Sequence, residues 1–200
     1  MVQKLIENQK YIYVLLSRTQ TVPSMLIRKY TREPYAHTSI ALDIELKEMY
    51  SFARKTVHNP FNCGFISENI EQGIFGRDKK TLCNVYALPV TQEQYQNVIK
   101  EISYFKGDVE NYNYNYLGVV ALMFGKAVEH KRRYFCSQFV SYILKNSGID
   151  LFDKSNALVK PYDFRMKLKD KIIYNGKLSE YRNFLDKADL KPKEEVAKAV

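Results

Sequence analysis

Cys136 is the residue whose type and position point most directly to chemistry. It lies in the stretch YFCSQFVSYILKNSG, in the expected first turn of a helix, where a side chain should be only partly buried. Unpaired backbone N–H groups and the helix dipole stabilise a thiolate there, lowering a thiol pKa from about 8.5 toward neutrality. The same N–H groups can hold the oxyanion of a tetrahedral intermediate. Because Cys136 shares a helix face with Val140, Ile143 and Ser147, it is, taken alone, more typical of a small core residue.

His37 is the histidine best placed to act as a base for such a cysteine. It follows Pro34 at the start of an expected strand, in the stretch PYAHTSIALD. A thiolate nucleophile needs an imidazole that takes up and returns a proton, and a histidine on a sheet that faces a helix N-terminus supplies one. The two other histidines, His58 and His130, lie in stretches expected at the surface. We therefore carry two hypotheses for His37, a catalytic base and a hydrogen-bonded structural histidine.

The segments around these two residues resemble the permuted NlpC/P60 hydrolases, the YiiX-like branch of the papain-like fold. In that family the catalytic histidine precedes the cysteine, the reverse of papain, and His37 precedes Cys136 here. The resemblance extends over residues 10–165. The matching stretches are YIYVLLSRTQTVPSMLIRKYTREPYAHTSIALD at 11–43, YNYLG at 114–118, YFCSQFV at 134–140 and, more weakly, KPYDF at 160–164.

The resemblance implies both a fold and an activity. The fold is α+β, with the cysteine helix packed on a small antiparallel, barrel-like sheet that carries the histidine. The activity is acyl transfer through a thioester, on amides of cell-wall peptides or on lipid esters and amides, with no cofactor. The expected function is thus a cysteine-dependent amidase, peptidase or acyl hydrolase with a peptide, amide or lipid-like substrate. The alternative is a catalytically inactive papain-like module that binds an anionic ligand.

A third catalytic member is not evident from the residues. Relatives usually place a polar residue on the following strand, where it orients the imidazole. A turn at 44–47 would set Arg54 opposite His37, but arginine has no acceptor for an imidazole N–H. Ser51 would reach the imidazole if the register slipped, and a backbone carbonyl could also serve. The role stays open among these candidates.

Two tyrosines and two further cysteines complete the candidate residues. A phenol of Tyr114 or Tyr116 near the nucleophile could donate to the oxyanion, as the family's tyrosine is thought to do. Packing within a tyrosine-rich loop explains both residues equally well. Cys63 and Cys83 show no metal-ligand spacing with each other or with Cys136, so no metal site is expected.

The elements that must position these residues can be predicted from local patterns. Runs of β-formers indicate strands, apolar residues at helical spacing indicate helices, and a capping box at Thr91 and Gln94 marks a helix start. The hairpin among them favours an antiparallel sheet. The expected elements are strands at 10–18 and 81–90, a hairpin of strands at 37–43 and 48–54, helices at 23–33, 92–106 and 136–147, and an irregular surface segment at 58–78.

Composition narrows the class of protein. The 200 residues suit one domain at 1–186 with a charged tail at 187–200, frayed or disordered. A net charge of +9 favours anionic partners, but the basic residues are scattered beyond Lys131-Arg132-Arg133, so no nucleic acid is expected. An odd count of three cysteines indicates a reducing compartment, and no apolar run approaches the ~18 residues of a membrane span. We therefore expect a cytoplasmic protein without a transmembrane segment.

Overall fold

A computed structural model describes residues 9–18, 33–56, 59 and 62–190 of the chain. Residues 23–32 of the predicted helix and His58 lie outside these ranges. The described chain ends three residues beyond the last helix, so residues 191–200 of the predicted tail also lie outside, and the domain boundary stays a prediction.

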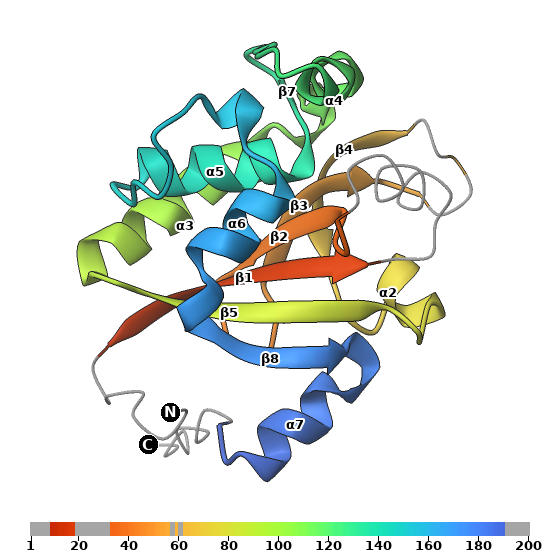
Figure 1. The fold of residues 1–200 in the computed structure, drawn as a ribbon, viewed down its shortest axis with the longest axis vertical. Helices are drawn as coiled ribbons and strands as arrows, with labels where there is room; N and C mark the ends of the chain where they lie inside the picture. The colour runs from red at the N-terminus through yellow and green to blue at the C-terminus, as the bar shows by residue number, and fades with distance from the viewer. Residues whose placement is uncertain (1–8, 19–32, 57–58, 60–61, 191–200) are drawn as a thin grey trace, which may run out of the picture.

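The centre of the molecule is one open sheet of eight strands in the described chain (Figure 1). The strand order is β7-β6-β4-β3-β2-β1-β5-β8, and every neighbouring pair is antiparallel except β6 with β7. The strands are β1 (Lys10–Arg18), β2 (His37–Ala41), β3 (Met49–Arg54), β4 (Cys63–Glu68), β5 (Leu82–Val90), β6 (Asn113–Tyr114), β7 (Arg133–Tyr134) and β8 (Ile172–Lys177). The predicted α+β class with a largely antiparallel sheet is confirmed.

Helices cover both faces of this sheet. Side chains of one face pack with α3 and α5, and those of the other face pack with α2 and α7. In β1, Val14 and Leu16 therefore belong to one core while Tyr13 and Leu15 belong to the other, which explains its unbroken apolar run. The helices are α2 (Gly73–Arg77), α3 (Gln92–Gly107), α4 (Tyr116–Met123), α5 (Cys136–Asn146), α6 (Pro161–Lys167) and α7 (Tyr181–Lys187).

The elements with strong local patterns lie where the sequence predicts them. The predicted strand at 10–18 is β1, the hairpin is β2 and β3, and the strand at 81–90 is β5. The capping box that begins α3 forms as expected between Thr91 and Gln94. Helix α5 begins at Cys136, and Gly148 follows its end with a φ of +76°, a conformation that glycine adopts without strain.

The predicted hairpin register is wrong by one residue. The structure pairs Ile40 with Tyr50 and Ala41 with Met49, so Arg54 does not lie opposite His37. The observed register places each apolar residue against a partner in the same core: Ile40 and Tyr50 belong to one, Ala41 and Met49 to the other.

The predicted irregular segment at 58–78 is also wrong, because it contains β4 and α2. Only Phe65 and Ile66 form an apolar pair in β4, so its local pattern is weak. Pairing along its full length with β3 makes it a strand. Gly64 allows this position, since a Cβ there would lie 2.3 Å from the Tyr112 carbonyl oxygen.

No helix within the described ranges combines the length and the apolar character needed to cross a bilayer.

Candidate active site

Cys136 is the first residue of α5, and hydrogen bonds of its two neighbours fix this helix start in place. The Phe135 N–H donates to Gln138 Oε1 at 3.3 Å, and the Ser137 hydroxyl donates to the Val159 carbonyl at 2.7 Å. The Cys136 sulfur lies 3.9 Å from the Ala36 carbonyl oxygen, just before β2. With 6% of its surface exposed, Cys136 is buried, so the prediction of partial burial is wrong. Contact with the start of β2 covers the side chain that an isolated helix end would leave open.

His37, the first residue of β2, meets Cys136 at this point. Its imidazole lies close enough to the Cys136 sulfur for each group to shift the pKa of the other, and its Nε2 lies 3.0 Å from Glu68 Oε1. Because Nε2 faces the carboxylate, Nδ1 is the nitrogen left for the sulfur. The Ser39 hydroxyl donates to Glu68 Oε2 at 2.5 Å and lies 3.2 Å from His37 Nε2. The Cys136 sulfur, the His37 imidazole and the Glu68 carboxylate thus form one continuous series of neighbouring groups.

Glu68 is the residue that sequence reasoning missed. It ends β4, which lies two strands from β2, a distance of about 10 Å at ordinary strand spacing. Its long side chain spans that distance past β3, where the buried Ser51 is small enough to leave room. The available signal is a carboxylate two residues after the short apolar stretch at 65–66, in a segment that the sequence predicts to be irregular.

Ser51 and Arg54, the two residues predicted as candidates for the third catalytic residue, lie at other positions around Cys136, His37 and Glu68. Ser51 is buried near this site, and its hydroxyl helps to lower the Glu68 pKa. Arg54 ends β3 opposite Cys63, and its charge acts on that thiol. Among the described groups that contact the imidazole, the Glu68 carboxylate is the charged acceptor, and the Ser39 hydroxyl lies beside it.

The electrostatics of the site favour an ion pair. Burial alone would raise the pKa of Cys136 and lower that of His37, but each group stabilises the charged form of the other. The His37 imidazole and the backbone N–H groups of Thr38 and Ser137 lower the Cys136 pKa below its ordinary value. Glu68 and Cys136 raise the His37 pKa from 6.5 to about 10. The two groups therefore stabilise each other as a thiolate beside an imidazolium.

Glu68, which follows His37 in this series of contacting side chains, is also charged. Burial would raise the pKa of Glu68, but His37 and the hydroxyls of Ser39 and Ser51 lower it below its ordinary value. Glu68 is consequently ionised at neutral pH and can accept a hydrogen bond from His37 Nε2.

The structure separates the two candidate tyrosines. Tyr114 lies against the nucleophile: burial, together with its contact with Cys136, raises its pKa well above 10, so the phenol stays protonated and can donate. The Tyr116 ring lies 4.9 Å from the Tyr114 ring, but its hydroxyl bonds to Cys63. Tyr114 is therefore the tyrosine next to Cys136, and Tyr116 packs against Tyr114.

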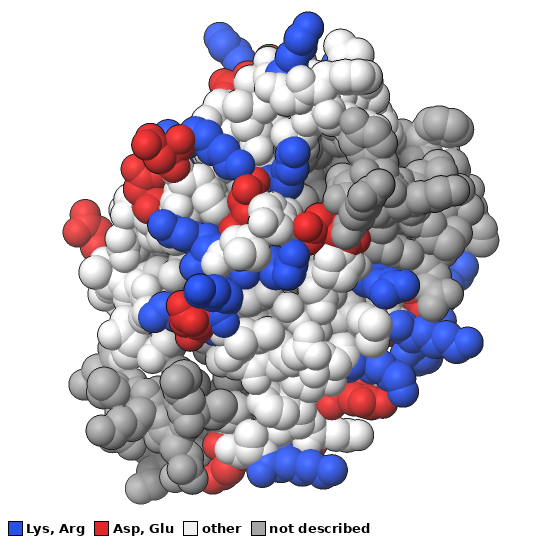
Figure 2. Space-filling view, in the orientation of Figure 1, with Lys and Arg blue, Asp and Glu red and all other residues white. Residues whose placement is uncertain are grey.

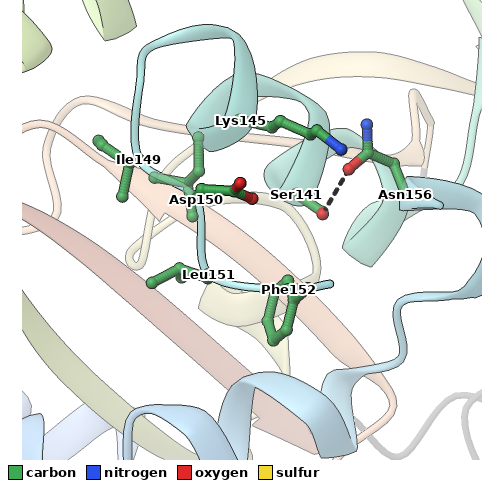
Figure 3. Close-up of a pocket in the computed structure, with 8 residues that line it drawn as sticks. Ser141, Lys145, Ile149, Asp150, Leu151, Phe152 and Asn156 are labelled. Atoms are coloured by element: carbon green, nitrogen blue, oxygen red, sulfur yellow. Dashed lines mark hydrogen bonds between the residues drawn. The ribbon is translucent and has the colours of Figure 1, made fainter. Parts of the chain in front are cut away.

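Two other features of the described residues were candidates for a functional site: a metal-ligand group and a surface recess. No three His, Cys, Asp or Glu side chains within it are grouped to hold a metal ion. A small recess lies beside the C-terminal half of α5, where Ser141 donates to Asn156 at 2.7 Å (Figure 3). Its lining includes neither Cys136 nor His37, so it is separate from the candidate site.

Comparison of the chain with protein-family models, with curated proteins and with solved structures finds no match. The assignment of a function therefore depends on the residues and the geometry of the site.

Proposed function

We propose that this protein is a cysteine-dependent hydrolase of permuted papain-like fold, with Cys136 as nucleophile, His37 as acid and base, and Glu68 as the residue that orients the imidazole. The observation that carries the proposal is the continuous buried chain from the Cys136 sulfur through His37 to the Glu68 carboxylate. A packing role for Cys136 does not require an imidazole and an ionised carboxylate in line with its sulfur.

In the first step, the Cys136 thiolate attacks the carbonyl carbon of an amide or ester. The oxyanion that forms is positioned for the Tyr114 phenol and the N–H groups at the start of α5. The bond to the leaving amine or alcohol then breaks, and the His37 imidazolium gives that group its proton. The product of this step is an acyl thioester on Cys136 beside a neutral imidazole.

In the second step, His37 acts as the base. Loss of the negative sulfur removes one of the contributions that raise the His37 pKa, which favours the neutral imidazole that can take a proton from an incoming water. Hydroxide attacks the thioester carbonyl, the carboxylic acid leaves, and the thiolate–imidazolium pair is restored. Glu68 holds the ring in place during both transfers.

The substrate class is an amide or ester of a peptide or lipid-like molecule, and the compartment is the cytoplasm. All three cysteines are free, which supports the reducing setting inferred from their odd number.

Selective alkylation tests the proposal directly. Native protein treated with iodoacetamide at about pH 6.5 should react at Cys136, because thiolates are the reactive form. Burial raises the pKa of Cys63 and raises that of Cys83 to about 12, so both serve as internal controls in peptide mapping. A screen of fluorogenic amides and esters then identifies a substrate for turnover. Slow, unselective labelling together with no turnover would instead favour the inactive ligand-binding module.

A further inference from the structure

Helix α4 is apolar around its whole circumference, yet it lies at the surface. Its sequence is YLGVVALM, and Gly118 is its one buried residue. Five of the ten exposed large hydrophobic side chains in the described part of the chain lie at 116–124. Leu117 and Phe124 are 71% and 73% exposed. Helices that are apolar all round are normally buried, so this one indicates a binding surface.

The start of α4 is fixed to the body of the protein. Asn115 caps the helix by accepting from the Gly118 N–H at 2.8 Å, and its side-chain amide donates to the Val128 carbonyl at 3.0 Å. The Asn115 N–H donates to the Tyr134 carbonyl at 3.0 Å. The exposed apolar face is thus presented by an anchored helix.

Cationic residues follow this helix directly. Segment 125–133 carries Lys126, Lys131, Arg132 and Arg133, all exposed, against the carboxylates of Glu129 within the segment and of Asp108, which pairs with Arg132 at 3.0 Å. The bond from Asn115 to Val128 and the pairing of β6 with β7 bring this segment back beside the start of α4. Figure 2 shows Lys and Arg side chains next to uncharged surface at the top of the molecule, where Figure 1 places α4 and β7.

We infer that α4, Phe124 and the segment 125–133 form a docking surface for an anionic lipid bilayer. A bilayer offers an apolar interior beneath a layer of negative headgroups, which matches an apolar helix with adjoining cations. At eight residues, α4 is far too short to span a bilayer, which takes ~20 residues, so it lies in the interface.

The docking surface adjoins the candidate active site. Tyr116 begins α4, its ring contacts that of Tyr114, and Tyr114 touches Cys136. A docked bilayer would therefore place lipid-borne acyl groups beside the nucleophile, and this last step rests on the proposed function.

Vesicle co-sedimentation tests the docking surface with the full chain. Wild-type protein should bind phosphatidylcholine vesicles that contain phosphatidylserine, bind pure phosphatidylcholine more weakly, and lose affinity as salt increases. Leu117→Ser and Phe124→Ser should each weaken binding about tenfold, because each removes a large apolar side chain from the lipid interface. Lys131→Gln should weaken it about fivefold. Tyr104→Ser, which removes another exposed aromatic side chain, from α3, is the matched control and should bind as wild type does.

Three results would overturn the docking proposal. The first is vesicle binding that is insensitive to Leu117→Ser and Phe124→Ser. The second is no binding by folded wild-type protein. The third is a dimer in sedimentation velocity that these two substitutions dissociate, because a second copy would then cover α4.

A separate set of measurements distinguishes vesicle docking from catalysis. Cys136→Ala should bind vesicles as wild type does, since Cys136 is buried and contributes no side chain to the docking surface. If docking fails but the proposed function holds, a soluble fluorogenic ester is still cleaved while vesicle binding is lost. If the proposed function fails, neither soluble nor vesicle-borne ester is cleaved although binding persists.

Discussion

Replacing Glu68 by glutamine should shift the pH range in which the enzyme works. The substitution removes the negative charge 3.0 Å from His37 Nε2 and keeps an oxygen that can accept the same hydrogen bond. The orientation of the imidazole is therefore retained while its electrostatic stabilisation is lost. Glu68→Gln thus isolates the charge of the third residue from its geometry.

The size of the shift follows from the ion pair. With the two charges about 4 Å apart and an effective dielectric constant of about 20, their attraction is about 4 kcal/mol. Since 1.36 kcal/mol corresponds to one pH unit, about 4 kcal/mol lowers the His37 pKa by about 3. The pKa of about 10 in the wild type would fall to about 7 in the variant. At neutral pH only about half of the variant would then carry the imidazolium that protonates the leaving group.

The pH dependence of kcat/KM reports this change, because its limbs follow the ionisation of the free enzyme. The descending limb should lie near pH 10 in the wild type and near pH 7 in Glu68→Gln. An NMR titration of the His37 ring protons, assigned with a His37→Asn variant, should move in parallel. Glu71→Gln is the control, because the Glu71 side chain is 55% exposed and pairs with Arg182 instead.

An unchanged descending limb in Glu68→Gln, with the His37 resonance still titrating near pH 10, would refute the reasoning. The carboxylate would then not be the charge that holds His37 protonated. A shift of equal size in Glu71→Gln would refute it as well, because an exposed charge that pairs with Arg182 would have the same effect.

Three further results are expected. Cys136→Ala should abolish turnover and Cys136→Ser should leave little, since serine is a poor nucleophile here; intact turnover in Cys136→Ala would end the hypothesis. Tyr114→Phe should reduce kcat about 10²–10³-fold if its phenol donates to the oxyanion, whereas Tyr116→Phe should have little effect; equal losses would contradict this assignment. Stability measured by urea unfolding should fall as the pH rises from about 8.5, the unfolded cysteine pKa, to about 10, because the native state keeps the His37 proton after the unfolded state has lost both protons. The expected loss in the wild type is about 2 kcal/mol. In Cys136→Ala the loss of stability should begin near pH 6.5, the ordinary histidine pKa. If stability began to fall at the same pH in the wild type and in Cys136→Ala, the ion pair would be excluded.

Local patterns in the sequence were sufficient to place the two central residues. The apolar run of β1, the turn residues of the β2–β3 hairpin and the capping box of α3 each act within a few neighbouring positions, so these elements were predictable. Cys136 at a helix start and His37 at a strand start follow from the same short-range signals. Their order in the chain also supports the resemblance to the permuted hydrolases.

Tertiary structure alone decided how the site is completed. Strand β4 exists because it pairs with β3, and only that pairing carries Glu68 to within 3.0 Å of His37. The one-residue register of the hairpin, the burial of Cys136 and the choice of Tyr114 over Tyr116 likewise depend on contacts between distant segments. Residue patterns record the preferences of neighbours in sequence, whereas these features arise from packing across the sheet, where a shift of one residue exchanges its two faces.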